Sequence, residues 1–76
     1  MLVVSEHCGY CQQVLEEFHE YGFTRPVIVV KYESCPNEVD HYFADENALP
    51  LIAHFSDGRI VRKAVGVDGI KNFERS

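Results

Sequence analysis

Residues 5–18 read SEHCGYCQQVLEEF, with two cysteines three positions apart. Behind the first cysteine, apolar residues recur at the spacing of one helix face, at Cys11, Val14, Leu15 and Phe18. A short and mostly apolar run of strand length, residues 2–5, comes directly before the pair. The cysteines therefore lie where a predicted strand leads into a predicted helix. This junction sets the first two elements of the fold.

Beyond this junction the pattern predicts a second strand and a second helix. The first helix is expected to end at Gly22, because glycine readily takes the left-handed conformation of a helix C-terminus. Residues 27–30 are a β-branched run that is typical of a buried parallel strand. Pro36 suits the first position of a second helix, which we expect to end near Asn47.

The last third of the chain predicts a β-hairpin and a final helix. Residues 51–55 and 60–65 read as strands, and Asp57-Gly58 between them favours a type I′ turn. Asp68 can cap the final helix, which carries Ile70 and Phe73 on one face. The order β-α-β-α-β-β-α predicts an α/β fold, a sandwich of helices on a four-stranded mixed sheet. We expect one domain over residues 1–76.

Composition narrows the classes of function. The net charge of −5 disfavours nucleic acid and anionic membrane surfaces as partners. Neither an export signal nor an apolar run of about 18 residues is apparent, so we expect a cytoplasmic protein. In that reducing compartment a lasting structural disulfide is rare, and a close cysteine pair is more often catalytic or metal-binding.

The positions of Cys8 and Cys11 predict different chemical roles. The free N–H groups at a helix start stabilise a thiolate, so Cys8 is expected to be the nucleophile. Cys11 lies one turn further on the apolar face, where a buried thiol can resolve a mixed disulfide formed by Cys8. Two alternatives are plain packing in the core and a zinc site that adds Cys35 and His7 or His41. Structural zinc sites usually combine two pairs of closely spaced ligands, and the sequence has only the pair Cys8 and Cys11. We therefore expect no metal.

In this order of elements the chain resembles the glutaredoxins of the thioredoxin-fold superfamily over nearly its whole length. The resemblance rests on Cys8-Gly9-Tyr10-Cys11, Leu49-Pro50, Asp57-Gly58 and Gly66-Val67-Asp68. It implies a thioredoxin-like fold in which Pro50 follows a cis peptide bond and faces the cysteine pair. It also implies that the backbone of Leu49 pairs with an extended substrate.

The resemblance further implies an activity and its co-substrate. Such a protein reduces protein disulfides or glutathione mixed disulfides, with glutathione as co-substrate and no tightly bound cofactor. By residue, the implied substrate-binding positions are Tyr10, Leu49, Pro50, Val67 and Asp68. Disulfide-containing proteins would be the partners, with ribonucleotide reductase as one candidate, and we expect a monomer.

The sequence departs from the usual glutaredoxin pattern at three places. Glu6 lies where many members have a lysine, Gly9 where dithiol members commonly have proline, and Val65-Gly66 where the family has paired glycines. Two alternatives therefore stay open. One is a thioredoxin-like protein reduced by a thioredoxin reductase, and the other is an iron–sulfur or metal carrier that uses the same cysteines.

Overall fold

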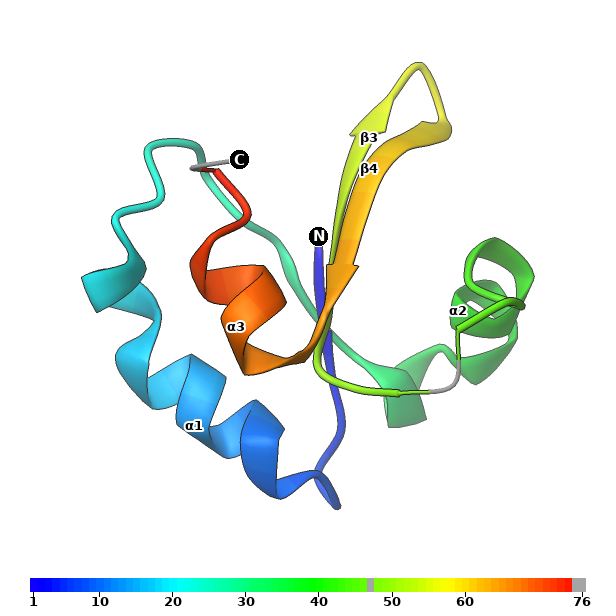
Figure 1. Ribbon diagram of the computed structural model, residues 1–76. Coiled ribbons are helices and arrows are strands. Elements are labelled where there is room, and N and C mark those ends of the chain that lie inside the picture. Colours follow the sequence, from blue (N-terminus) through cyan, green and yellow to red (C-terminus); the bar gives the residue numbers. More distant parts are fainter. Residues whose placement is uncertain (47, 75–76) are drawn as a thin grey trace.

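The computed structural model describes residues 1–46 and 48–74, and it is a mixed α/β structure with a four-stranded mixed sheet and three α-helices (Figure 1). In chain order the elements are β1 (Leu2–Val4), α1 (Gly9–Glu17), the 3₁₀ turn η1 (Phe18–Tyr21), β2 (Val29–Lys31), the 3₁₀ turn η2 (Tyr32–Ser34), α2 (Pro36–Tyr42), β3 (Leu51–Ser56), β4 (Arg59–Val65) and α3 (Gly66–Lys71). This arrangement is compatible with a thioredoxin-like fold.

The strands lie in the order β2-β1-β3-β4, with β1 parallel to β2 and the other neighbours antiparallel. Figure 1 shows α1 and α3 on one side of the sheet and α2 on the other. Because the carboxyl ends of β1 and β2 meet at one edge of the sheet, the loop that leads from β1 into α1 emerges beside the end of β2.

Two hydrophobic clusters cover the two faces of the sheet. Side chains alternate along β1, so Leu2 and Val4 pack in the cluster under α1 and α3, whereas Val3 packs in the cluster under α2. Cys11 belongs to the first cluster and Cys35 packs against the second. The sheet therefore separates these two cysteines.

The predicted first helix and hairpin are confirmed. The helical segment that begins at Gly9 continues through η1 and ends at Gly22, whose φ of 73° is left-handed. In the hairpin, Asp57 and Gly58 both have positive φ, at 55° and 76°, as a type I′ turn requires. Local turn chemistry was sufficient to predict both features.

The prediction of a buried second strand is wrong in two respects. The strand begins at Val29 and includes Lys31, and it lies at the edge of the sheet. Val29 and Ile28 are exposed, with 72% of the Ile28 surface accessible. An apolar run shows that a strand is favoured, but whether the strand is central or peripheral depends on its neighbours.

The predicted ends of the other two helices also need correction. The second helix ends at Tyr42, because the backbone of Phe43 leaves the helical conformation while its side chain enters the core. Asn47, where we expected this helix to end, lies outside the described residues. In the last helix the N-cap is Val65, and Asp68 lies inside the first turn. Gly66, with φ of 88°, lets the chain pass directly from β4 into α3, so the helix starts before Asp68 can cap it.

Candidate functional site

Cys8 is the N-cap residue of α1 and therefore lies at the junction that the sequence predicts. Its backbone is extended, with φ of −111° and ψ of 111°, and its sulfur accepts a hydrogen bond from the Cys11 N–H at 3.2 Å. The Cys8 thiol also donates a hydrogen bond to the Leu49 carbonyl oxygen at 3.4 Å. The half-buried sulfur is thus held between a helix amide and the loop before β3.

Cys11 is buried, with only 1% of its surface accessible. Burial, with a smaller contribution from the Cys8 side-chain hydrogen bond, raises the pKa of Cys11 to about 12. At neutral pH this side chain is a thiol, because ionisation would place a charge among the apolar side chains of the first cluster. All three cysteines of the chain lie within the described residues and are free thiols.

The residues predicted to bind substrate line one cleft of about 510 Å³ next to Cys8. The Leu49–Pro50 bond is cis, as the resemblance implies, and the Pro50 carbonyl accepts a hydrogen bond from the Gly66 N–H at 2.8 Å. This bond ties the start of α3 to the loop before β3. The cleft is lined by Tyr10, Gln13, Leu49, Pro50, Val65, Gly66, Val67, Asp68 and Gly69.

Within this cleft the predicted residues present different groups. Tyr10 is in the first turn of α1, and 68% of the surface of this residue is exposed. Val67 and the exposed Asp68 lie in the first turn of α3. The cleft therefore combines apolar surface with one carboxylate, and its loop side is formed by Leu49 and Pro50.

A second cleft, of about 620 Å³, lies on the other side of Cys8 and includes Lys31. The Lys31 ammonium pairs with the Glu6 carboxylate at 3.5 Å, and both side chains are largely exposed. Sequence reasoning did not connect Lys31 with the cysteines. The parallel pairing of β1 and β2 brings them together, because Lys31 lies opposite Val4, the last residue of β1 before the loop that carries Cys8.

Glu33 is a further polar neighbour that sequence reasoning missed. The Ser5 hydroxyl donates a hydrogen bond to the Glu33 carboxylate, and the Glu6 N–H donates another at 3.3 Å. The hydrogen bond from Ser5 lowers the pKa of Glu33, so this carboxylate stays ionised at neutral pH. Its negative charge adds a minor contribution to the raised pKa of Cys11.

The structure does not bring Cys35 to the other cysteines. Cys35 packs against the cluster on the α2 side of the sheet, and its thiol lies 3.9 Å from the Lys31 carbonyl oxygen, to which it donates. Across residues 1–46 and 48–74 there is no group of three or more His, Cys, Asp or Glu side chains that could hold a metal ion. The zinc set that the sequence offered as an alternative is therefore not assembled among these residues.

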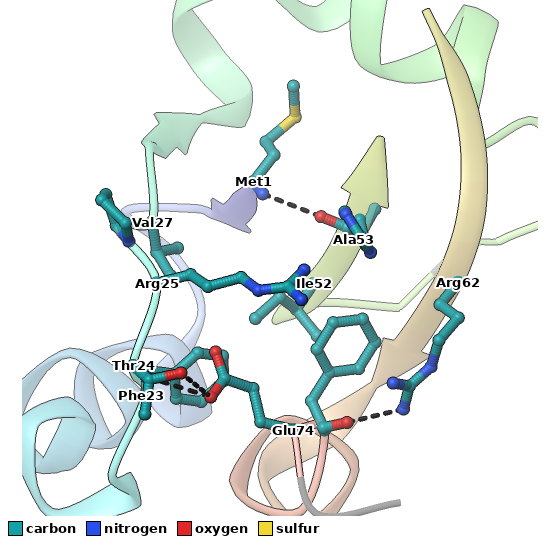
Figure 2. A pocket seen from close by; sticks show the side chains of 12 residues that line it. Met1, Phe23, Thr24, Arg25, Val27, Ile52, Ala53, Arg62 and Glu74 are labelled. Atoms are coloured by element: carbon teal, nitrogen blue, oxygen red, sulfur yellow. Dashed lines mark hydrogen bonds between the residues drawn. The ribbon is translucent and has the colours of Figure 1, made fainter. Parts of the chain in front are cut away.

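A separate cavity of about 490 Å³ lies at the opposite ends of the central strands, near Met1 and Ala53. Figure 2 shows the Arg25 side chain extending across this cavity and the Glu74 carboxylate turned toward Thr24. None of the site residues predicted from the sequence lines it. We therefore place the candidate functional site at the cysteine pair.

In the part of the chain that the structure describes, every helix is too short or too polar to cross a membrane. A scan against models of known protein families and a search of curated proteins both found no match. The functional assignment therefore depends on the geometry of the site and on the resemblance in its motifs.

Proposed function

We propose that the protein is a glutaredoxin-like thiol–disulfide oxidoreductase that reduces protein or glutathione mixed disulfides. The observation that supports this most directly is the placement of the Cys8 sulfur. It caps the amino terminus of α1, remains partly exposed, and lies next to both Cys11 and the cleft at Leu49. The Cys11 N–H of the first helical turn points at this sulfur, and a cysteine sulfur is the group that attacks in disulfide exchange.

The reaction follows from the two sulfurs. The Cys8 thiolate attacks one sulfur of the substrate disulfide; the substrate S–S bond breaks, and the leaving thiolate takes a proton from water. Cys11 then loses its proton to a solvent base and attacks the Cys8 sulfur, which releases the second substrate thiol. Two electrons and two protons pass to the substrate, and the protein is left with a Cys8–Cys11 disulfide. Two equivalents of glutathione would return it to the dithiol.

The cleft supports a peptide-like substrate. The backbone next to Pro50 can pair with an extended chain, and the Asp68 carboxylate can accept an ammonium group such as the one on the γ-glutamyl end of glutathione. The exposed Tyr10 ring gives the substrate an apolar contact at the same cleft. These are the positions that the glutaredoxin resemblance implies.

The first test separates the roles of the three cysteines. Reduction of a small disulfide is followed through NADPH consumption, with glutathione and glutathione reductase as the reducing system. Cys8→Ser should abolish the activity, because it removes the nucleophile. Cys11→Ser should accumulate a mixed disulfide that mass spectrometry detects, and Cys35→Ser is the matched control that keeps wild-type activity. Equal partial losses in the first two variants would contradict these roles.

The reductant and the metal-carrier alternative are tested with the same material. Replacing the glutathione system by thioredoxin reductase should give much slower turnover, and the reverse result would place the protein with the thioredoxins. After anaerobic purification, the masses of the oxidised and reduced forms should differ by two hydrogens, with the reduced form the heavier. Stoichiometric iron or zinc that is lost in Cys8→Ser would contradict the oxidoreductase proposal.

A further inference from the structure

A fourth pocket lies beside Leu49, on the side of the sheet that α2 covers. It measures about 300 Å³, and its floor consists of the buried side chains of Val39, Phe43 and Leu51. We call it the α2 pocket; its remaining lining residues are Tyr32, Asp40, Glu46, Ala48 and Leu49. It has an apolar base and a polar opening.

The polar groups at the opening are hydrogen-bond acceptors with negative charge. The Tyr32 hydroxyl donates to the Asp40 carboxylate at 3.0 Å, which leaves other lone pairs of that exposed carboxylate open to solvent. Glu46 shares the Lys63 ammonium with Asp45, at 3.4 Å and 2.7 Å respectively. Three carboxylates thus accompany one ammonium, and the net charge of this group is about −2.

The segment that forms the pocket carries further negative charge. Residues 32–46 contain five acidic side chains and neither lysine nor arginine, and the acidic residues are Glu33, Glu38, Asp40, Asp45 and Glu46. A protein with a net charge of −5 therefore concentrates a large part of its negative charge around α2. Such a surface attracts a cationic group and repels a carboxylate.

Leu49 connects the pocket with the reacting sulfur. Leu49 lines both the α2 pocket and the cleft with Pro50, and the Leu49 carbonyl accepts the hydrogen bond from the Cys8 thiol. An extended substrate chain advances about 3.3 Å per residue, so a chain that runs past Leu49 can carry a side chain near its reacting cysteine to this pocket. A long aliphatic stem with a cation at its tip matches an apolar floor and an acidic rim.

We propose that the α2 pocket receives a lysine or arginine side chain close to the reacting cysteine of a protein substrate. The protein then selects disulfides flanked by basic residues, and Asp40 and Glu46 determine this specificity. This inference rests on the proposed oxidoreductase function and names its substrate class.

The test compares disulfide peptides that differ only beside the reactive cysteine, where they carry Lys, Gln or Glu. We expect kcat/KM for the Lys peptide to exceed that for the Glu peptide about fivefold to tenfold at low salt, as partly exposed ion pairs allow. The difference should lie mainly in KM, and it should shrink when salt is added. A small uncharged disulfide provides the reference activity.

A double variant, Asp40→Asn with Glu46→Gln, should bring the Lys and Glu peptides to within about twofold of each other without changing reduction of the small disulfide. The matched control is Glu16→Gln with Glu20→Gln, which also removes two negative charges but lies in α1 and η1, on the other side of the sheet. It should keep the wild-type preference.

The outcomes separate this inference from the function on which it rests. Equal kcat/KM for all three peptides, or a preference that the double variant retains, would overturn the α2 pocket as the specificity site while leaving the oxidoreductase function in place. Failure to reduce any peptide and the small disulfide as well would overturn both.

Discussion

At the scale of single residues, Cys8 and Cys11 differ in where their sulfurs lie. The Cys8 sulfur lies at a helix terminus, lines one cleft and contacts Leu49 of another, whereas the Cys11 residue is covered by the cluster under α1 and α3. One turn of helix produces this difference, because the apolar face of α1 carries Cys11 inward with Val14. The two residues stay in contact, because the Cys11 backbone N–H donates a hydrogen bond to the Cys8 sulfur at 3.2 Å.

The burial of Cys11 predicts how stability depends on pH. Its pKa is raised from an ordinary value of 9.0 to about 12, so the native state keeps a proton that the unfolded chain releases. This contribution to the free energy of unfolding is complete below pH 9.0 and is lost as the pH rises toward about 12. Urea unfolding at about pH 8 and about pH 10.5 measures the loss, which cannot exceed about 1.4 kcal/mol per pH unit for one group.

The control for this prediction is Cys11→Ala. Burial also raises the pKa of Tyr21, so part of the alkaline loss belongs to that hydroxyl and stays in the variant. The slope of unfolding free energy against pH should be shallower in Cys11→Ala than in the wild type. Identical slopes would show that the Cys11 thiol does not contribute.

At the scale of elements, the junctions between strands and helices form the site. The β1–α1 junction supplies Cys8, the loop before β3 supplies Leu49 and Pro50, and the β4–α3 junction supplies Gly66 and the two residues after it. The Gly66 N–H bonds to the Pro50 carbonyl, so the last two junctions support each other. A change in either one should alter the cleft.

Gly66→Ala tests the β4–α3 junction. Gly66 has φ of 88°, while the Cβ that alanine would add meets no heavy atom within 4 Å among the described residues beyond its chain neighbours and its own helix backbone. The cost therefore comes from backbone conformation alone, and we expect the free energy of unfolding to fall by about 1–2 kcal/mol. Chemical denaturation measures it.

Gly9→Ala is the matched control, because its added Cβ also meets open space and its φ is not positive. Gly9 begins α1, where alanine is the better helix former, so stability should be unchanged or higher by up to about 1 kcal/mol. Equal destabilisation by the two substitutions would contradict a conformational requirement at Gly66.

At the scale of the whole molecule, stability comes from two small clusters on a four-stranded sheet. Ile70 of α3 is fully buried under the same face as α1, at 0% exposure. Ile70→Ala should cost about 2–5 kcal/mol. That is a large part of the roughly 4–11 kcal/mol expected for a domain of this length, so urea unfolding should show a much lower midpoint.

Val61→Thr is the corresponding surface control. Val61 is in β4 with 54% of its surface accessible, and threonine keeps the β-branched shape that strands favour. The change should stay within about 0.5 kcal/mol. A similar loss at both positions would mean that the cluster under α3 is not the stabilising core.

Most of the helices, strands and turns were predictable from the sequence, whereas the position of each one in the sheet was not. The hairpin at Asp57-Gly58 and the helix end at Gly22 were predicted because each depends on the conformational preference of one or two residues. The edge position of β2 was not predicted, since the run 27–30 is compatible with a central or a peripheral strand. The candidate site follows the same division: its cysteines were predicted, and the resemblance named five of the nine residues that line its cleft, whereas Gln13, Lys31, Glu33 and the α2 pocket were not predicted.

The sequence by itself determined the spacing of the two cysteines, the burial of Cys11 on the apolar face of its helix, and the sharp turn of the hairpin. Each of these depends on residues within one helical turn or one loop. No local pattern places Leu49 against Cys8, 41 residues away; the resemblance implied that the neighbouring Pro50 faces the cysteines, and the tertiary structure shows the contact and the acidic pocket beside it. Such contacts depend on strand order and on which face of the sheet each helix covers, and local patterns in a sequence do not specify either.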